Sequence, residues 1–370
     1  MIKKLLLSIL LVVSLYSSAQ TTVIDSIMSG GIYRNYRLYI PASYNGATAY
    51  PLILNIHGYT SNAAAQQTYT VFEPIADTAH FLMVYPNATI YMGQPTWNSG
   101  FGMAVNDVQF LSDLIDSLST SYNIDQNSVY STGMSNGGYM SHTLACALSN
   151  KIAAIASATG SMTPYQKSTC SAGRAVPVMQ IHGTADGTVP YAGTTTSLNI
   201  DTLVHYWVLN DNCNPTPVYN AVPDINTGDG ATADHYVWNG GDHGSTVELY
   251  KINGGGHTWP GSPYIVGVTD EDFNASEKIW LFFRKYHLSQ FTGVNELLEA
   301  EKVSLYPNPS NDLITIDAER FSSASIVDMN GRMIVASTKK QIDISLLPNG
   351  VYSVVVLAGK SKIVKKLVKI

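Results

Sequence analysis

Apolar runs with the length of buried strands alternate with helix-like segments along most of this 370-residue chain. The strand-like runs are residues 51–58, 81–87, 129–133, 151–160, 177–183 and 247–252. Helical stripes fall among them, as at Val108, Leu111, Leu114, Ile115 and Leu118, and again between residues 200 and 208. This alternation predicts an α/β fold with a mostly parallel sheet covered on both faces. Functional residues of such sheets lie at the carboxyl ends of the strands.

The first 19 residues have the pattern of a signal peptide. Lys3 and Lys4 precede an apolar run over residues 5–15, and the small residues Ser17 and Ala19 mark a cleavage site after Ala19. The run is too short to span a bilayer comfortably, and no later segment is long and apolar enough to do so. A buried N-terminal helix is the alternative. We expect a secreted protein without a stable membrane span.

Net charge and cysteine spacing argue against nucleic-acid and zinc binding, and they leave the choice of disulfide open. The formal net charge of −6 argues against a nucleic-acid partner, which needs a basic surface. The spacings of Cys146, Cys170 and Cys213 do not resemble a zinc site, and no pattern indicates a cofactor. Of the possible disulfides we favour Cys170–Cys213, because both residues lie in loop-like sequence, whereas Cys146 lies in an apolar stretch.

The pattern changes after residue 288. We predict a catalytic domain over residues 20–288, a linker over 289–301, and a second domain over 302–370. The second domain contains short strand-like runs separated by turn signals such as Asn330-Gly331. This composition predicts a small all-β sandwich.

Gly133, Ser135 and Gly137 form a G-x-S-x-G motif between a predicted strand and a predicted helix. In this context the motif forms a sharp turn that exposes a nucleophilic serine above the sheet. A serine hydroxyl needs a base to take its proton, and the chain order on such a sheet is serine, acid, histidine. We therefore predict Ser135 as the nucleophile.

The predicted base is His257, on a glycine-rich loop directly after the strand at residues 247–252. The predicted acid is Asp186, which follows the strand at residues 177–183 and would orient the imidazole. Other acids and histidines fall in helices or polar loops, where solvated or capping roles are more common. These alternatives are His142, His205, His235, His243, His287, Asp201, Asp211, Asp224, Asp229 and Asp242.

Backbone N–H groups near Ser135 would stabilise the oxyanion of the reaction. One is that of Asn136, and the second comes from Tyr59 or Thr60 in the loop after the strand at residues 51–58. His57 precedes Ser135 in the chain, so we predict a structural side chain or a wall of the site rather than a base. The remaining candidates for substrate contact are Trp259, two residues from His257, and Trp97, which could equally belong to the core.

The segments around these residues resemble those of a known family. They read NIHGYT from residue 55, GMSNGG from 133, IHGTADGTVPY from 181 and GGGHTWPG from 254. Residues 30–287 resemble secreted polyhydroxybutyrate depolymerase-like and feruloyl or acetylxylan esterase-like enzymes. The resemblance implies an α/β-hydrolase fold, the triad Ser135, Asp186 and His257, and release of an acyl group from a polymer. Many relatives have a Cys where this chain has Tyr59, so no disulfide is drawn there by analogy.

The C-terminal domain has a resemblance of its own. The segments LYPNPS (305–310), VDMNGR (327–332) and LPNGVYSVVV (347–356) are similar to a type A sorting domain of the type IX secretion system. Such a domain implies the secretion machinery as a partner and an extracellular or cell-surface destination.

Together the residues predict a secreted serine carboxylic ester hydrolase that works through an acyl-enzyme. Feruloyl or acetyl groups on plant polysaccharide are the favoured substrate, with polyhydroxybutyrate-type polyester as the alternative. Two other classes remain open: a serine peptidase of the prolyl-oligopeptidase type, and a non-catalytic surface-binding protein on a hydrolase fold.

Overall fold

The computed structural model describes residues 20–100, 102–292, 303–328, 332–358 and 361–370. The predicted signal peptide and most of the predicted linker lie outside these residues. The chain divides into two compact units, Met1–Thr292 and Gly293–Ile370, and each is described by itself. The first residues of the predicted linker belong to the first unit. They form helix α8 (Ser289–Thr292), and its Phe291 packs into the core of that unit.

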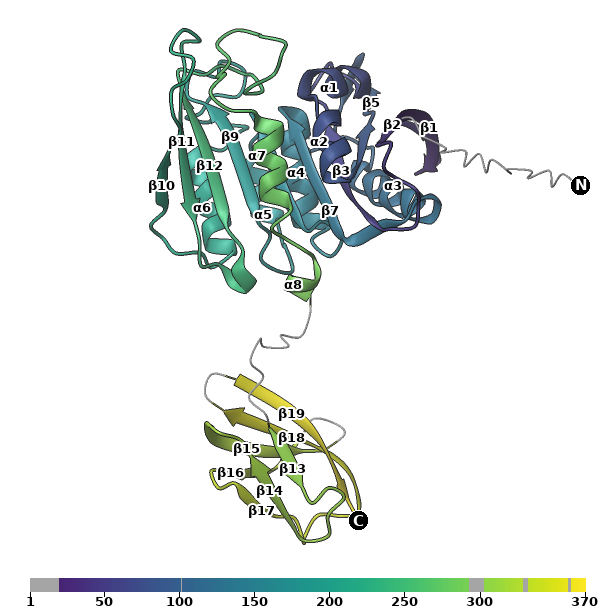
Figure 1. Cartoon of the computed structure of the whole chain (residues 1–370), viewed down its shortest axis with the longest axis vertical. Helices are drawn as coiled ribbons and strands as arrows, with labels where there is room; N and C mark the ends of the chain where they lie inside the picture. The colour runs from purple at the N-terminus through teal and green to yellow at the C-terminus, as the bar shows by residue number, and fades with distance from the viewer. Residues whose placement is uncertain (1–19, 101, 293–302, 329–331, 359–360) are drawn as a thin grey trace, which may run out of the picture. The chain divides into compact units, whose positions relative to one another are not determined.

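The first unit is built on one ten-stranded sheet (Figure 1). In spatial order its strands are β1 (Thr21–Ser29), β2 (Ile32–Ile40), β4 (Leu82–Pro86), β3 (Tyr50–Ile56), β7 (Ile124–Met134), β8 (Ala154–Ala158), β9 (Val178–Gly183), β12 (Val247–Asn253), β11 (Thr232–Trp238) and β10 (Val218–Ala221). The strands from β4 to β12 are parallel, and they correspond to the strand-like runs of the sequence. The prediction of an α/β fold with a mostly parallel sheet is confirmed.

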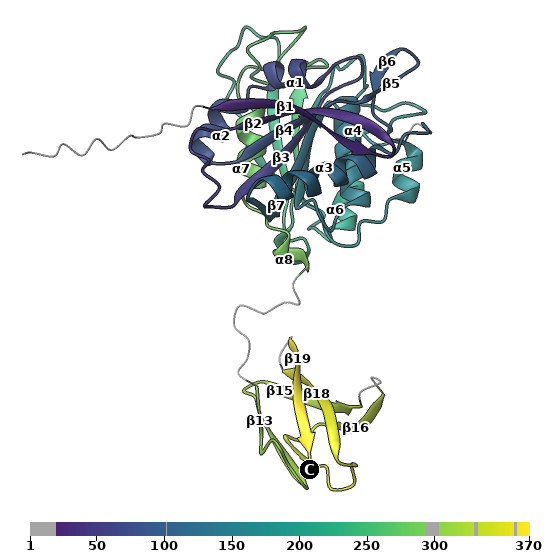
Figure 2. The same cartoon turned by 90° about the vertical axis from the view of Figure 1, so that its right-hand side faces the viewer.

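Helices cover both faces of this sheet (Figure 2). One face carries α3 (Asp107–Ser121), α4 (Asn136–Ala147) and α6 (Ile200–Asn210), and the other carries α1 (Ala63–Thr70), α2 (Glu73–Ala79) and α7 (Ala275–Phe283). Successive strand side chains point to opposite faces, so β3 supplies both layers. Its Leu52 and Leu54 lie in the core under α3, α4 and α6, whereas Ile53 lies in the core under α7.

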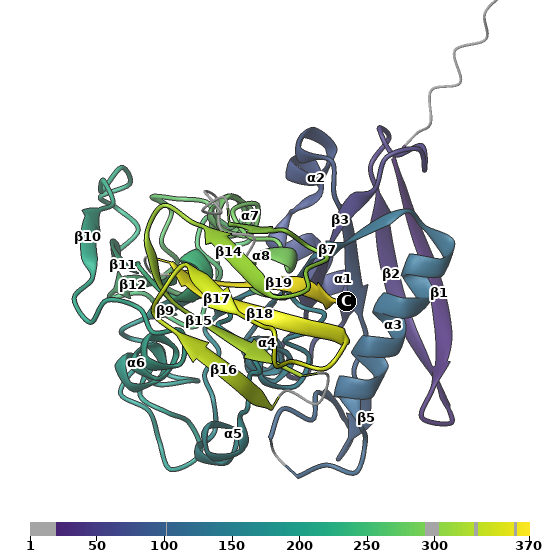
Figure 3. The ribbon, with the colours of Figure 1, turned by 90° about the horizontal axis from the view of Figure 1, so that it is seen from below.

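The edges of the sheet differ from its centre. Strands β1, β2, β10 and β11 pair antiparallel and were not predicted, because their exposed and half-buried residues lack a continuous apolar run. Helix α3 lies beside β1 (Figure 3), where the Ser29 hydroxyl donates to Asp113 Oδ2 at 2.7 Å. The short helices α1, α2 and α5 (Pro164–Thr169) were also missed, since none is long enough to give a clear stripe.

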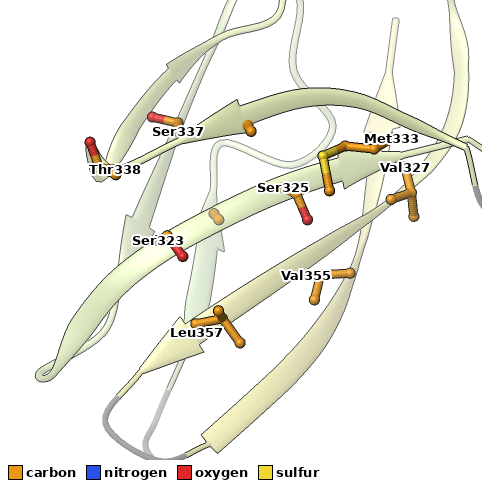
Figure 4. A pocket seen from close by; sticks show the side chains of 10 residues that line it. Ser323, Ser325, Val327, Met333, Ser337, Thr338, Val355 and Leu357 are labelled. Carbon is orange, nitrogen blue, oxygen red and sulfur yellow. The ribbon is translucent and has the colours of Figure 1, made fainter.

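The second unit is an all-β sandwich, as predicted. Three strands form one sheet, in the order β13 (Ser304–Tyr306), β14 (Leu313–Asp317) and β17 (Gln341–Asp343). Four form the other, in the order β16 (Met333–Ser337), β15 (Phe321–Val327), β18 (Gly350–Ala358) and β19 (Ser361–Lys369). Inward side chains such as Ile316, Ile326 and Val354 fill the core. The outward residues Ser325, Met333, Val355 and Leu357 line an open depression on the second sheet (Figure 4).

The predicted disulfide Cys170–Cys213 is wrong. Cys170, at the end of α5, bonds instead to Cys146 in the last turn of α4, with Cα atoms 5.0 Å apart. The apolar sequence around Cys146 belongs to a helix whose final turn is half-buried, so the side chain reaches the neighbouring loop. Cys213 is buried and free after α6.

Replacing both Cys146 and Cys170 by serine should lower the free energy of unfolding by about 3 kcal/mol, because the bond closes a loop with a sequence separation of 24. Urea unfolding with and without reductant measures this. The wild type should lose stability in reductant and the double variant should not respond. A wild type that is insensitive to reductant would contradict a stabilising role for the bond.

Candidate active site

Ser135 lies alone between the end of β7 and the start of α4, in a strained turn. Its backbone has φ 55° and ψ −121°, which side-chain-bearing residues rarely adopt. The Ser135 N–H donates to the carbonyl of Ala158, and the Ser135 carbonyl accepts from the N–H of Tyr139. These bonds tie the turn to the neighbouring strand and to the helix, and they hold the serine at the carboxyl edge of the sheet.

Glycines permit this turn because it lies directly against strand β3. A Cβ at Gly137 would lie 2.0 Å from the carbonyl oxygen of Ile56, and one at Gly133 would lie 2.6 Å from the same atom. Gly58 faces the turn from the other side, since a Cβ there would lie 3.3 Å from the Cβ of Ser135. The turn and the loop after β3 therefore pack backbone to backbone, and the hydroxyl of Ser135 lies beside that loop.

His257 and Asp186 form a close pair. His257 Nδ1 lies 2.8 Å from Asp186 Oδ2, and Asp186 Oδ1 accepts from the N–H groups of Thr188 and Val189, both at 2.8 Å. Burial alone would raise the pKa of Asp186, but the hydrogen bond and charge of His257 and the N–H of Val189 lower it below its ordinary value. Asp186 is therefore held as a carboxylate.

Two backbone N–H groups near Ser135 are free to donate. Among the described residues, the N–H groups of Asn136 and Tyr59 have no acceptor. The Gly58 carbonyl lies 2.7 Å from His57 Nδ1 and accepts from the Ser61 N–H, so the trans peptide directs the Tyr59 N–H to the opposite side. The N–H of Thr60 instead donates to the Pro95 carbonyl at 3.1 Å, which leaves Tyr59 as the donor of this loop.

The structure buries His57, Trp97 and Trp259, so none of them lines the surface of the site. For His57 and Trp97 this agrees with the structural alternative, whereas the prediction that Trp259 contacts substrate is wrong. His57 is fully buried, accepts from the Ala88 N–H at Nε2, and has its pKa lowered to about 4 by burial. The Trp97 indole donates to the His57 carbonyl at 2.9 Å, and that of Trp259 donates to Ser276. All three are therefore buried side chains with a structural role.

Two cavities meet at Ser135, and Tyr59 lines both. The larger one, of about 900 Å³, also contains His257 and is here named the tyrosine cavity. Further residues that line it are Tyr69, Tyr264, Val266, Ala64 and Ala65. The smaller one, of about 410 Å³, is named the hydroxyl cavity, and it is lined by Thr96, Tyr139, Thr188, Thr194, Thr196, Ser197, Val189 and Pro190. Sequence reasoning missed these lining residues because most lie in irregular loops without a motif.

Metal-type clusters and membrane-length helices are both absent from the described parts of the chain. Within them, no group of three or more His, Cys, Asp or Glu side chains is placed to hold a metal ion. None of their helices combines the length and the apolar character that a membrane crossing requires.

Both units contain a segment that matches a known family. Residues 44–204 match the phospholipase/carboxylesterase family, and residues 304–370 match the secretion system C-terminal sorting domain. The chain is 30% identical over 249 residues to the bifunctional acetylxylan esterase/xylanase XynS20E of Neocallimastix patriciarum, which covers 67% of this chain but only 34% of that protein. It is 27% identical to feruloyl esterase D of Neurospora crassa, over 70% of this chain and 83% of the relative.

A solved structure of acetyl xylan esterase from Aspergillus awamori aligns with 64% of this chain and 94% of its own length, with 16% identity and a TM-score of 0.49. The mostly parallel sheet, with a serine in a sharp turn between β7 and α4, is the α/β-hydrolase fold, and the family matched by residues 44–204 is one of phospholipases and carboxylesterases. The chain joins this carboxylesterase-type domain to a sorting domain of the secretion system kind, so the protein is destined for the cell surface or the extracellular space.

Substituting Gly137 by alanine should lower the free energy of unfolding by more than about 3 kcal/mol, because the new Cβ would overlap the backbone of β3. Thermal unfolding followed by circular dichroism measures the loss. Gly187→Ala is the matched control, since a Cβ there meets no atom within 4 Å. Equal stability of the two variants would contradict the backbone packing described here.

Proposed function

We propose that the protein is a secreted serine esterase in which Ser135, His257 and Asp186 act as the catalytic triad. The observation that carries this proposal is the hydrogen-bonded pair of His257 and Asp186 beside a serine held at positive φ, with both Ser135 and His257 lining one cavity. The similarity to enzymes named as feruloyl and acetylxylan esterases supports an ester rather than a peptide as the substrate.

The geometry supports an acyl-enzyme mechanism. His257 takes the proton of the Ser135 hydroxyl as the oxygen attacks the ester carbonyl, and Asp186 stabilises the imidazolium that forms. The N–H groups of Asn136 and Tyr59 stabilise the oxyanion. His257 then returns the proton to the departing alcohol, and water releases the acid from Ser135 by the same steps.

In this proposal the alcohol part of the ester binds in the tyrosine cavity and the acyl part in the hydroxyl cavity. The alcohol that leaves must take its proton from His257, so it occupies the tyrosine cavity, where aromatic rings offer flat apolar surfaces to a sugar. The acyl group then occupies the hydroxyl cavity, whose volume of about 410 Å³ exceeds the need of an acetyl group. We therefore favour a feruloyl ester of a polysaccharide, whose phenolic hydroxyl and methoxy groups match the serine and threonine side chains there.

Ser135→Ala should abolish turnover of p-nitrophenyl acetate and labelling by a fluorophosphonate probe, because the substitution removes the oxygen that attacks in the proposed mechanism. Labelling is read by mass spectrometry of the intact protein. Ser61→Ala is the control, since Ser61 lines the tyrosine cavity without a role in the attack. Turnover that persists in Ser135→Ala would overturn the assignment, and a wild type that reacts with neither reagent would favour a binding protein.

Thr196→Phe, which fills part of the hydroxyl cavity, should lower kcat/KM for methyl ferulate at least tenfold and leave that for p-nitrophenyl acetate within about threefold. Tyr264→Ala should instead raise KM for feruloylated oligosaccharide without changing that for methyl ferulate. Steady-state kinetics on the three esters measures both effects. Equal losses on methyl ferulate and p-nitrophenyl acetate in Thr196→Phe would contradict this division.

A further inference from the structure

A continuous row of buried polar side chains leads from helix α6 to the acid of the active site. Its members are Trp207 on α6, His142 on α4, and Gln180 and His182 on β9. All four side chains are fully buried, so water cannot replace a missing partner. The direction of every hydrogen bond in the row is therefore fixed by the protein itself.

Trp207, at the α6 end of the row, determines which ring nitrogen of His142 accepts a hydrogen bond. An indole N–H can only donate, and Trp207 Nε1 lies 3.1 Å from His142 Nδ1. His142 Nδ1 must therefore accept, and burial lowers the pKa of His142 to about 4, so the ring is neutral. Its single proton lies on Nε2, which faces the carbonyl oxygen of Gln180 at 3.2 Å.

Gln180 in turn determines which ring nitrogen of His182 accepts a hydrogen bond. The Gln180 amide nitrogen lies 2.9 Å from the carbonyl of Gly160, which can only accept, and 3.1 Å from His182 Nδ1. The amide cannot turn over without setting its oxygen against the Gly160 carbonyl. His182 Nδ1 therefore accepts, and because burial also lowers the pKa of His182, its single proton lies on Nε2.

The Nε2–H of His182 meets the loop that carries the acid. It lies 2.8 Å from the carbonyl of Val189 and 3.4 Å from Asp186 Oδ2. The N–H of Val189 donates to Asp186 Oδ1, so Val189 is held on both sides. The other tautomer of His182 would direct a lone pair at the Val189 carbonyl and at the carboxylate, and both contacts would become repulsive.

We propose that His182 is a positioning residue for the triad: its Nε2–H holds Asp186 in reach of His257, and Gln180, His142 and Trp207 select the tautomer that makes this possible. The inference rests on the proposed function of Asp186. His182 contributes no charge and touches no substrate. It acts by fixing the loop from Gly183 to Val189, and through it the carboxylate that orients the catalytic imidazole.

Two substitutions at His182 separate this role from simple packing. His182→Gln keeps an N–H near the position of Nε2, whereas His182→Leu fills the space without a donor. With p-nitrophenyl acetate, we expect His182→Leu to lower kcat at least tenfold at unchanged KM. His182→Gln should recover most of that loss. Gln180→Leu, which frees the tautomer of His182, should lower kcat in the same way.

The proton between His257 Nδ1 and Asp186 provides a readout independent of turnover. In a triad this proton gives a low-field signal in one-dimensional proton NMR, because it is held in a charge-assisted hydrogen bond. The signal should be present in the wild type and in His182→Gln. It should be lost or broadened in His182→Leu, at a temperature at which circular dichroism shows both variants to be folded.

His235→Leu is the matched control. His235 lies on β11, and its Nε2 is 2.9 Å from the buried Glu248 on the neighbouring strand β12, away from the site. This variant should lose stability but keep kcat and the low-field signal. If His182→Leu keeps both, or if His182→Gln and His182→Leu lose both equally, the positioning role is wrong while the esterase assignment stands. A wild type without esterase activity that keeps the low-field signal would instead reject the proposed function alone.

Discussion

The contact between the turn at Ser135 and the end of strand β3 is the constraint on which the rest of the site depends. Gly133 and Gly137 bring two backbone segments so close to Ile56 that no side chain fits between them. This contact sets the hydroxyl of Ser135 beside Gly58, which precedes Tyr59 with its free N–H, while the free N–H of Asn136 follows the serine directly. Loss of the contact would misplace nucleophile and oxyanion donors together.

Buried side chains hold the loops that carry the chemistry. His57 and Trp97 fix the loop after β3 through its carbonyl oxygens, and His182 fixes the loop that carries Asp186 through the carbonyl of Val189. In each case burial lowers the pKa of a histidine, His57 or His182, and its two nitrogens then have different roles, one as donor and one as acceptor. The site is thus built from polar contacts that lie below the surface seen by a substrate.

The sequence could predict those parts of the structure that a periodicity or a motif encodes. Continuous apolar runs identified the parallel strands, and G-x-S-x-G with ordered downstream partners identified residues that the fold brings to one edge of the sheet. The edge strands β1 and β10 could not be predicted, because each pairs with only one other strand. Most of their side chains are exposed or half-buried, so their sequences contain no continuous apolar run. Trp259 was assigned to the substrate because sequence shows that it lies two residues from His257 but not the direction of its side chain. The disulfide partner of Cys170 was missed for the same reason, because sequence does not show the direction of the Cys146 side chain in the last turn of α4.

The odd cysteine has a consequence for export. A chain that passes through an oxidising compartment with three cysteines can form the wrong pair, because thiolates attack existing disulfides. Burial raises the pKa of the Cys213 thiol to about 11, and its Sγ lies 3.9 Å from the carbonyl oxygen of Ser245, to which the thiol donates. Once folded, Cys213 is therefore both protonated and shielded, and the bond between Cys146 and Cys170 is safe from exchange within its own chain. A cysteine introduced on the surface could then carry a single fluorescent label without removal of the native thiol.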